Sequence, residues 1–562
     1  MKETRTSWLT AISGFLLIGM VLTACNGSGA NRVESNPPSE TATVKPVTVT
    51  WMTNGDKVYE WEDSPILRKL TEKTGVKMEF SIAGGDKDQK AGVMIAGGDY
   101  PDVIEGAKQT QKFIDAGALI PLDDLIDEYG PNIKKIWGDS LNKLRNPKDG
   151  KIYFIGNQPR NRQGEIIDAN QSLLIQYDVL DKLGYPTPKT LDDVEKMLKD
   201  YMALVPNLDG KPWVPWGLWA DTWGYDITIN NPAQWVNGLM DDSNAFVNTD
   251  DTSVQYFNKT DQFKWYLQWL NKMYNQGMID ENAFITKNDQ YKSLVSTGRV
   301  LAMIDGTWNI KDSESALRQA GMPERAYARF PILRSGEIQD RSQIDAESYS
   351  WGVSITKNAK DPAAIVKMLD YVASTEGTIL MNWGIEGTHY DVVDGKRVQK
   401  PEIAQKLRDD PEYGKREGLP AGQWGQYGNG YSLVKLDDGD YANPNSPEDV
   451  YANADEWTKR VMDKYGIKYW GQMFDLSGKP NPYGFAWTVP IPQDSAAQLA
   501  VTKADEIRHS AVPGIITAKS PDEFEKNWTS FQNKLNDAKI SEWEKEMSNA
   551  IKERLKLWGV TQ

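Results

Sequence analysis

The sequence predicts an α/β protein built from two lobes, and three observations support this. Residues 47–51 alternate apolar and polar side chains, the pattern of a strand. A turn cluster at 53–56 follows, and Ser64-Pro65 then opens a helix with an apolar stripe. Strands and helices continue to alternate along a chain of 562 residues, which is too long for one hydrophobic core.

The first 24 residues have the pattern of a signal peptide. Lys2 and Arg5 supply positive charge, and the apolar run at 8–21 is too short for a spanning helix. The run ends in LTAC, which resembles the lipobox of bacterial lipoproteins. That resemblance implies cleavage before Cys25 and diacylglycerol on its sulfur, an anchor that does not cross the bilayer. The alternative is a signal peptide followed by an incidental cysteine.

Residues 25–46 are rich in Ser, Pro, Asn, Glu and Thr without apolar periodicity, which predicts a flexible tether. The net charge of -15 argues against nucleic acid and anionic membrane surfaces as partners. Two histidines and one cysteine exclude His/Cys zinc sites and Cys-His catalysis. The stretch Asn207–Gly210 only partly matches a calcium loop. We therefore expect no metal and no cofactor.

Aromatic residues are unusually frequent, with 21 Trp, 24 Tyr and 13 Phe. Tryptophan is favoured where an apolar face meets a polar partner. Pyranose rings have such faces, with C–H bonds on one side and hydroxyl groups around the rim. The tryptophan excess therefore favours a carbohydrate ligand over a peptide. The alternative for each single ring is packing in the core.

Several stretches in chain order resemble one family. WMTNGDK, AGGDYPDVIEG, GALIPLDDLI and DGKIYFIG are similar to bacterial extracellular solute-binding lipoproteins of family 1, which bind carbohydrates for ABC importers. NWGIEGTHYDV resembles the larger members that carry alginate and pectin fragments. The resemblance implies a two-lobe, periplasmic-binding-protein-like (type II) fold with hinge crossings and a ligand cleft between the lobes.

The resemblance also implies a function without catalysis. The protein is expected to capture an oligosaccharide and deliver it to the permease subunits of an ABC importer. We expect a monomer, held by its lipid at the extracytoplasmic face of the cell membrane, on a Gram-positive surface or facing a periplasm.

The first candidate contacts follow strands of the first lobe. The loop at 54–57 lies at the carboxyl end of a predicted strand, where open α/β sheets bind ligands. In maltodextrin relatives the matching loop hydrogen-bonds sugar hydroxyls, which implies Asn54, Asp56 and Lys57 as contacts. Glu105 follows the predicted strand 102–104 on the matching second loop. The alternative is an ordinary loop between strand and helix.

Further candidates lie in the crossings and the second lobe. Arg160 falls in the polar crossing at 158–170, where a guanidinium would match a carboxylated sugar; the alternative is a solvated loop. Trp223 and Trp235 belong to a turn-rich, Trp-dense segment without helical periodicity, and Asp226, Asn230 and Asn231 lie between them. Trp308 begins a helix after the predicted strand 300–304. The relatives' tryptophan in that motif stacks on a sugar ring.

The last candidates precede or follow the hairpin signal Asp394-Gly395. Trp351 lies near a second crossing, and Trp424 lies in a glycine-rich loop. Glu386 and His389 are three residues apart on a loop broken by glycine. For that pair a structural role is the first reading, ligand contact the second and acid/base catalysis the third.

The C-terminal stretch predicts two packing helices. Ser520-Pro521 opens the first, with Glu523 completing a capping box. Apolar residues recur at helical spacing in 524–535 and again in 543–555. The predicted organisation is a signal peptide (1–24), a lipidated tether (25–46), lobe 1 (47–165 and the return segment 348–400), and lobe 2 (166–347, with its remainder and packing helices at 401–562).

Two other classes of function remain open. A lipid-anchored glycoside hydrolase would need two carboxylates about 5–9 Å apart across a glycosidic bond. With 79 acidic residues the sequence permits such a pair. A peptide or amino-acid carrier would need fixed charges for the ligand termini.

Overall fold

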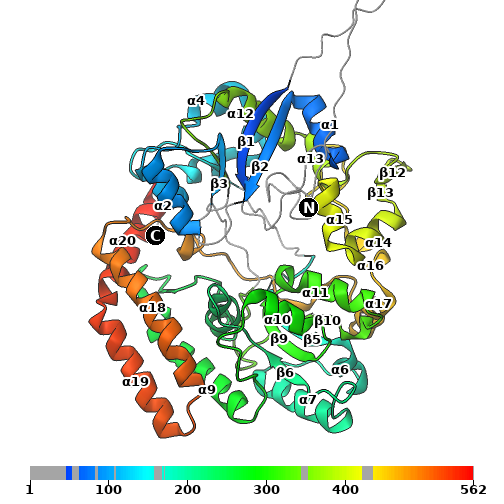
Figure 1. Cartoon of the computed structure of the whole chain (residues 1–562), viewed down its shortest axis with the longest axis vertical. Helices are drawn as coiled ribbons and strands as arrows, with labels where there is room; N and C mark the ends of the chain where they lie inside the picture. The colour runs from blue at the N-terminus through cyan, green and yellow to red at the C-terminus, as the bar shows by residue number, and fades with distance from the viewer. Residues whose placement is uncertain are drawn as a thin grey trace, which may run out of the picture. The chain divides into compact units, whose positions relative to one another are not determined.

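Two separate main sheets organise the molecule (Figure 1). The computed structural model describes residues 46–53, 63–82, 87–106, 109–156, 167–169, 171–342, 352–419 and 434–560. These residues belong to one unit, Pro46–Gln562. The predicted signal peptide, Cys25 and the tether up to residue 45 lie outside the described part of the chain.

The first sheet has five strands in the order β2-β1-β3-β11-β4. β1 pairs in parallel with β2 and β3, whereas β11 is antiparallel to both β3 and β4. A strand from the middle of the chain therefore lies between two from its beginning. The strands are β1 (Val47–Thr53), β2 (Val76–Ile82), β3 (Val103–Gly106), β4 (Ile155–Gly156) and β11 (Gly352–Ile355).

Both faces of this sheet are covered. Trp51 is fully buried in a core cluster with residues of α1 and α12, while Met52, the next residue of β1, belongs to a second cluster with residues of α2 and α3. The period of two in β1 thus serves two hydrophobic layers. The surrounding helices are α1 (Pro65–Thr74), α2 (Lys87–Gly97), α3 (Thr110–Asp115), α4 (Asp123–Tyr129), α5 (Pro131–Trp137), the 3₁₀ helix η2 (Gly138–Leu144), α12 (Pro362–Ala373) and α13 (Thr375–Asn382).

The second sheet has four strands in the order β10-β5-β9-β6. β6 runs parallel to β9, and β5 is antiparallel to both β9 and β10. Leu173 and Leu174, neighbours on β5, point to different core clusters, so this sheet is also covered on both faces. The strands are β5 (Gln171–Gln176), β6 (Val214–Gly217), β9 (Val300–Gly306) and β10 (Tyr327–Phe330).

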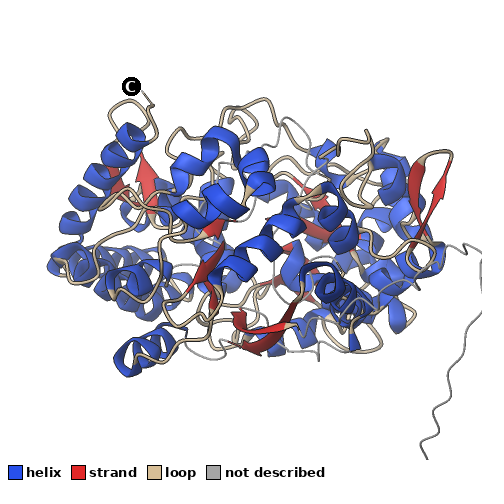
Figure 2. Ribbon diagram, turned by 90° about the horizontal axis from the view of Figure 1, so that it is seen from above, coloured by secondary structure: helices blue, strands red, loops and turns tan. Residues whose placement is uncertain are grey.

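Helices and short elements make up the rest of the described chain. Seen at a right angle, the strands lie among helices (Figure 2). The elements are α6 (Tyr177–Lys182), α7 (Leu191–Leu204), the π-helix η3 (Asp226–Asn230), α8 (Asn231–Trp235), β7 (Ala245–Val247), β8 (Val254–Tyr256), η4 (Phe257–Lys259), α9 (Asp261–Asn275), α10 (Asn288–Val295), α11 (Thr307–Gln319), η5 (Pro323–Arg325), the hairpin β12 (Tyr390–Val393) and β13 (Lys396–Gln399), α14 (Pro401–Asp409), α15 (Pro411–Glu417), α16 (Pro447–Ala452), α17 (Glu456–Tyr465), η7 (Trp470–Met473) and η8 (Ala486–Thr488).

Local capping signals predicted several of these boundaries correctly. Ser64 caps α1 by accepting from the Leu67 N–H, and Gly75 ends the helix with a left-handed φ of 70°. Thr190 begins α7 with a capping box. Asp394 and Gly395, both with positive φ, form the turn of the predicted hairpin.

The segment 401–419 bonds to elements of both halves. From α11, the Ser315 hydroxyl donates to the Arg408 carbonyl at 2.7 Å. From the end that precedes α1, the Ser64 hydroxyl donates to the Glu417 carbonyl at 2.7 Å. α14 and α15 therefore connect the region of the first sheet with that of the second.

Three C-terminal helices, α18 (Ala496–Ile516), α19 (Pro521–Asp537) and α20 (Ile540–Leu557), pack on one another and on α9 (Figure 1). Both predicted apolar stripes are buried. The capping box differs in one bond: Ser520 accepts from the Glu523 N–H as predicted, but the Glu523 carboxylate accepts from the Lys519 N–H. No helix in the described ranges combines the length and apolar character that crossing a membrane requires.

We expect the Leu535→Ala variant to lower the free energy of unfolding by about 2–5 kcal/mol, since this fully buried side chain of α19 leaves a cavity. Leu499→Ala on α18 is the matched control. Leu499 is 58% exposed, so its truncation should change stability by less than about 0.5 kcal/mol. Urea denaturation measures both, and equal effects would contradict the packing described here.

Candidate functional site

Two tryptophans form an exposed stacked pair beside the second sheet. The ring centroids of Trp223 and Trp308 are 5.6 Å apart and their planes are inclined by 28°. Trp223 is 42% exposed and Trp308 is 52% exposed. Large apolar side chains are normally covered, so two adjacent exposed indoles mark a binding surface. Trp308 thus keeps about half of its surface exposed although Trp223 stacks on it.

The pair lies where two parallel strands end. β9 ends at Gly306 and α11 begins with Thr307, so Trp308 is in the first turn of the helix. β6, parallel to β9, ends at Gly217, a few residues before Trp223. Open α/β sheets bind ligands outside the carboxyl ends of their strands. A Cβ on Gly306 would fall 2.5 Å from Cε2 of Trp308, so only glycine lets the indole lie back over the strand end.

A third tryptophan, Trp219, supports the pair from below. It is fully buried and meets Trp223 edge-to-face, with centroids 4.5 Å apart and planes at 89°. A Cβ on Gly224 would lie 2.2 Å from the Trp219 ring. In the sequence between Trp219 and Trp223, Thr222 adopts a φ of 48°, a strained value for a β-branched residue. The turn that presents Trp223 is therefore held by close packing against Trp219.

Asp305 anchors the buried side of this cluster. Its carboxylate accepts from the Gly306 N–H at 2.6 Å, from Nδ2 of Asn309 at 3.2 Å and from Nε1 of Trp219 at 3.4 Å. Burial raises the pKa of Asp305 to about 6, while these hydrogen bonds oppose the rise. Asp305 thus links the end of β9, α11 and Trp219 in one buried polar network.

A long-range ion pair holds the chain that follows Trp223. Arg508 of α18 bonds to Asp226 at 2.6 Å and to Asp505 at 3.1 Å, and its guanidinium lies 4.7 Å from the centroid of the Tyr225 ring. Asp226 begins the π-helix η3, a rare element that is frequent near functional sites. The turn carrying Trp223 is therefore fixed to the C-terminal helices.

The carboxyl end of the first sheet carries the predicted Glu105. The residue lies within β3, since the strand extends to Gly106 and not to 104 as predicted. The Thr53 hydroxyl, at the end of β1, donates to Oε2 of Glu105 at 2.7 Å. The remaining predicted contacts Asn54, Asp56, Lys57, Arg160, Trp351 and Trp424 lie outside the described residues.

Two predicted ligand contacts need correction. Trp235 is only 4% exposed and belongs to the main core cluster, so its ring has no free face. His389 is fully buried: its Nδ1 accepts from the Ile385 N–H at 3.0 Å, and its Nε2 lies 3.2 Å from Oε2 of Glu417. Both His389 nitrogens serve the protein itself, which matches the structural reading of that loop.

The polar residues expected between Trp223 and Trp235 are also structural. Asp226 pairs with Arg508, Asn230 donates to the Ser243 carbonyl, and Asn231 donates to Asp241. Glu386 is exposed, and its backbone pairs with that of Tyr390 in the same loop. Trp219 and Asp305 were missed as supporting residues. The signal for Asp305 was its place between a buried strand and Trp308.

The comparisons with known proteins identify a family. Residues 58–379 match the family described as bacterial extracellular solute-binding protein. The fructooligosaccharide ABC transporter substrate-binding protein FusA of Streptococcus pneumoniae is 29% identical over 39% of this chain, a match that spans 42% of that protein's length. The polygalacturonan/rhamnogalacturonan-binding protein YtcQ of Bacillus subtilis is 24% identical over 70% of this chain and 75% of its own.

Solved structures agree on the fold. The alginate-binding protein AlgQ2 superposes with a TM-score of 0.62 at 20% identity, over 91% of this chain and 99% of that one. The N-glycan transport solute-binding protein NgtS of Streptococcus pneumoniae gives a TM-score of 0.57 at 17% identity, over 91% of this chain and 99% of that one. These neighbours have the type II periplasmic-binding-protein-like fold, so the predicted fold class is confirmed.

We expect the stability of the Asp305→Asn variant relative to wild type to rise between pH 4 and pH 8. Burial raises the pKa of Asp305 from 3.8 to about 6, so the folded protein holds this proton more tightly than the unfolded chain. The wild type loses that contribution, on the order of 1–3 kcal/mol, as the pH rises through 6, whereas asparagine does not ionise. Urea denaturation at each pH measures the difference. A constant difference would contradict a buried, proton-holding Asp305.

Proposed function

The chain belongs to the bacterial extracellular solute-binding protein family, and on this premise we propose that it captures an oligosaccharide and delivers it to an ABC importer. The relatives named for sugars support the carbohydrate class: FusA for fructooligosaccharides and YtcQ for polygalacturonan and rhamnogalacturonan. The observation that carries the proposal is the exposed Trp223–Trp308 pair at the ends of β6 and β9.

The geometry of the pair suits a sugar better than a peptide. The exposed part of the Trp308 indole offers an apolar surface on which the C–H bonds of a pyranose ring can pack. Such stacking tolerates several sugars, so hydrogen bonds from neighbouring loops must supply the specificity. The predicted contacts Asn54, Asp56, Lys57, Glu105, Arg160, Trp351 and Trp424 remain proposals for that role.

Binding changes the population of two conformations and breaks no bond. The lobes close on the ligand, and the closed form is the one that the importer recognises. Membership of the two sheets supports placing β1 to β4 and β11 in lobe 1, and β5, β6, β9 and β10 in lobe 2. The assignment of residues 401–562 to lobe 2 stays a prediction. Membership of a family of binding proteins favours this function over the glycoside hydrolase that the acidic residues would also permit.

The N-terminal sequence supports a lipid anchor at the extracytoplasmic face. LTAC places Cys25, the only cysteine, after an apolar run and small residues. A diacylglycerol on Cys25 followed by the tether of residues 25–46 would keep the binding lobes near the importer. The lipoprotein LipO of Bacillus subtilis, 22% identical over 59% of this chain, is in line with such an anchor.

We expect Trp308→Ala and Trp223→Ala each to weaken binding of the best ligand from a glycan array at least tenfold, because loss of an aromatic anchor costs about 2 kcal/mol or more. Titration calorimetry measures the affinity. The control is Trp265→Ala on α9, a partly buried ring outside the stacked pair that packs against the core. Unchanged affinity in both Trp308→Ala and Trp223→Ala would refute the site.

The same samples test catalysis. Incubation of the purified chain with each bound oligosaccharide should raise the thermal midpoint and produce no new reducing ends. Steady release of reducing ends by the purified wild type would replace the proposal with the hydrolase.

We expect Cys25→Ala to abolish incorporation of a labelled fatty acid and to move the protein from the membrane fraction to the medium or periplasm, since the sulfur is the attachment point. Labelling that persists in this variant would place the anchor elsewhere. Glycan affinity of the released protein should equal that of the wild type.

A further inference from the structure

The exposed face of α11 continues beyond Trp308 to a lysine. Along the first two turns of the helix, Trp308 and Lys311 are exposed, whereas Asn309, Ile310 and Ser313 are buried. Residues three apart on a helix are neighbours, with Cβ atoms about 5–6 Å apart. The exposed Trp308 indole and the Lys311 ammonium group therefore belong to one surface. Both lie in the first half of α11, toward the positive end of its dipole.

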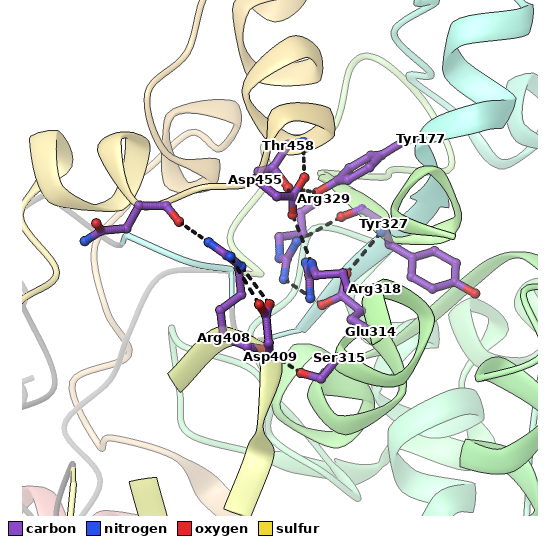
Figure 3. A network of polar contacts seen from close by, with 11 residues as sticks. Tyr177, Glu314, Ser315, Arg318, Tyr327, Arg329, Arg408, Asp409, Asp455 and Thr458 are labelled. Atoms are coloured by element: carbon purple, nitrogen blue, oxygen red, sulfur yellow. Dashed lines mark hydrogen bonds and ion pairs between the residues drawn. The ribbon is translucent and has the colours of Figure 1, made fainter. Parts of the chain in front are cut away.

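The next residue on this stripe, Ser315, is covered. Its hydroxyl donates to the Arg408 carbonyl of α14 (Figure 3). Gln319, one turn further along α11, also bonds to the Asp409 carbonyl. Arg318 of the same helix pairs with Asp455 at 2.9 Å. The exposed window on α11 is therefore bounded at its far end by α14 and the start of α17.

Lys311 and Asp168 are both exposed, yet the surrounding protein disfavours the charged form of each. Asp168 keeps 44% of its side-chain surface exposed and Lys311 is also exposed. Desolvation by the surrounding protein nevertheless raises the pKa of Asp168 and lowers the pKa of Lys311. Asp168 lies within the predicted crossing at 158–170.

Carboxylates around Lys311 are engaged by other cations. Asp168 and Glu314 both pair with Arg329, at 2.7 and 3.4 Å. Asp312 pairs with Lys292 at 3.6 Å. Glu412 pairs with Lys415, and the Lys415 ammonium is close enough to Lys311 to disfavour its charge. Within the described ranges, Lys311 makes no ion pair or hydrogen bond.

We propose that Lys311 binds the carboxylate of an acidic sugar residue, a uronate, in an oligosaccharide whose next ring stacks on Trp308. The inference rests on the proposed function and adds the chemical class of the ligand. A single ammonium offers three donors and one charge, which suits a monoanionic carboxylate. The nearby Asp168 disfavours a more highly charged group. The bound carboxylate also relieves the repulsion between Lys311 and Lys415.

The test compares two trisaccharides that differ only in the esterification of their carboxylates, trigalacturonate and its methyl ester. The wild type should bind trigalacturonate at least tenfold more tightly than the ester, and raised salt should reduce that preference. Lys311→Met keeps the apolar stem and removes the charge, so it should lose most of the preference while binding the ester unchanged. Lys311→Arg should retain the preference in large part.

The control is Lys196→Met on α7, which removes an exposed lysine elsewhere on the second half and should leave both affinities unchanged. Equal wild-type affinity for acid and ester, or an equal loss of both in Lys311→Met, overturns the proposal. Binding of neutral oligosaccharides alone, abolished by Trp308→Ala, overturns it too but leaves the proposed function intact. Failure to bind any oligosaccharide on an array refutes the proposed function itself.

Discussion

The exposed aromatic pair depends on the burial of one ring, Trp219. This indole fills the space between β6 and α10, stacks on Tyr291 and meets Trp223 edge-to-face. Such contact fixes the turn on which Trp223 sits, with Thr222 held in a strained conformation. An aromatic platform needs this rigidity, because each rotamer that a free indole samples must be lost when a sugar docks. Packing of the buried Trp219 ring therefore restricts the conformations of the exposed pair before a sugar binds.

Electrostatics extends this support to the end of the chain. Arg508 is almost fully buried and shared by Asp226 and Asp505, so removal of both carboxylates would leave the guanidinium charge uncompensated in the interior. Through Asp226 the bond reaches the π-helix after Trp223, across 282 positions of sequence. The three C-terminal helices thus do more than cover a hydrophobic surface. They determine where the turn bearing Trp223 lies.

Local features were predictable from the sequence and distant ones were not. Ser64, Gly75 and Thr190 mark helix ends because their capping bonds are made within four residues. The place of Trp308 near the start of a helix was predictable because the strand before it has a clear apolar pattern. Trp223 and Trp235 stand in the same aperiodic segment, and only the fold exposes one and buries the other. The structural role of His389 depends on Glu417, 28 positions away, which no local pattern reveals.

The segment 401–419 imposes a mechanical condition on any hinge motion. It is joined to α11 through Arg408 and to the start of α1 through Glu417. A rotation that carries it with one half must stretch or exchange its bonds to the other. Each such neutral hydrogen bond contributes only about 0.5–1.5 kcal/mol net. The segment 401–419 therefore acts as a weak restraint on the angle between the two halves. It can bias that angle in the absence of ligand, and ligand binding can override it.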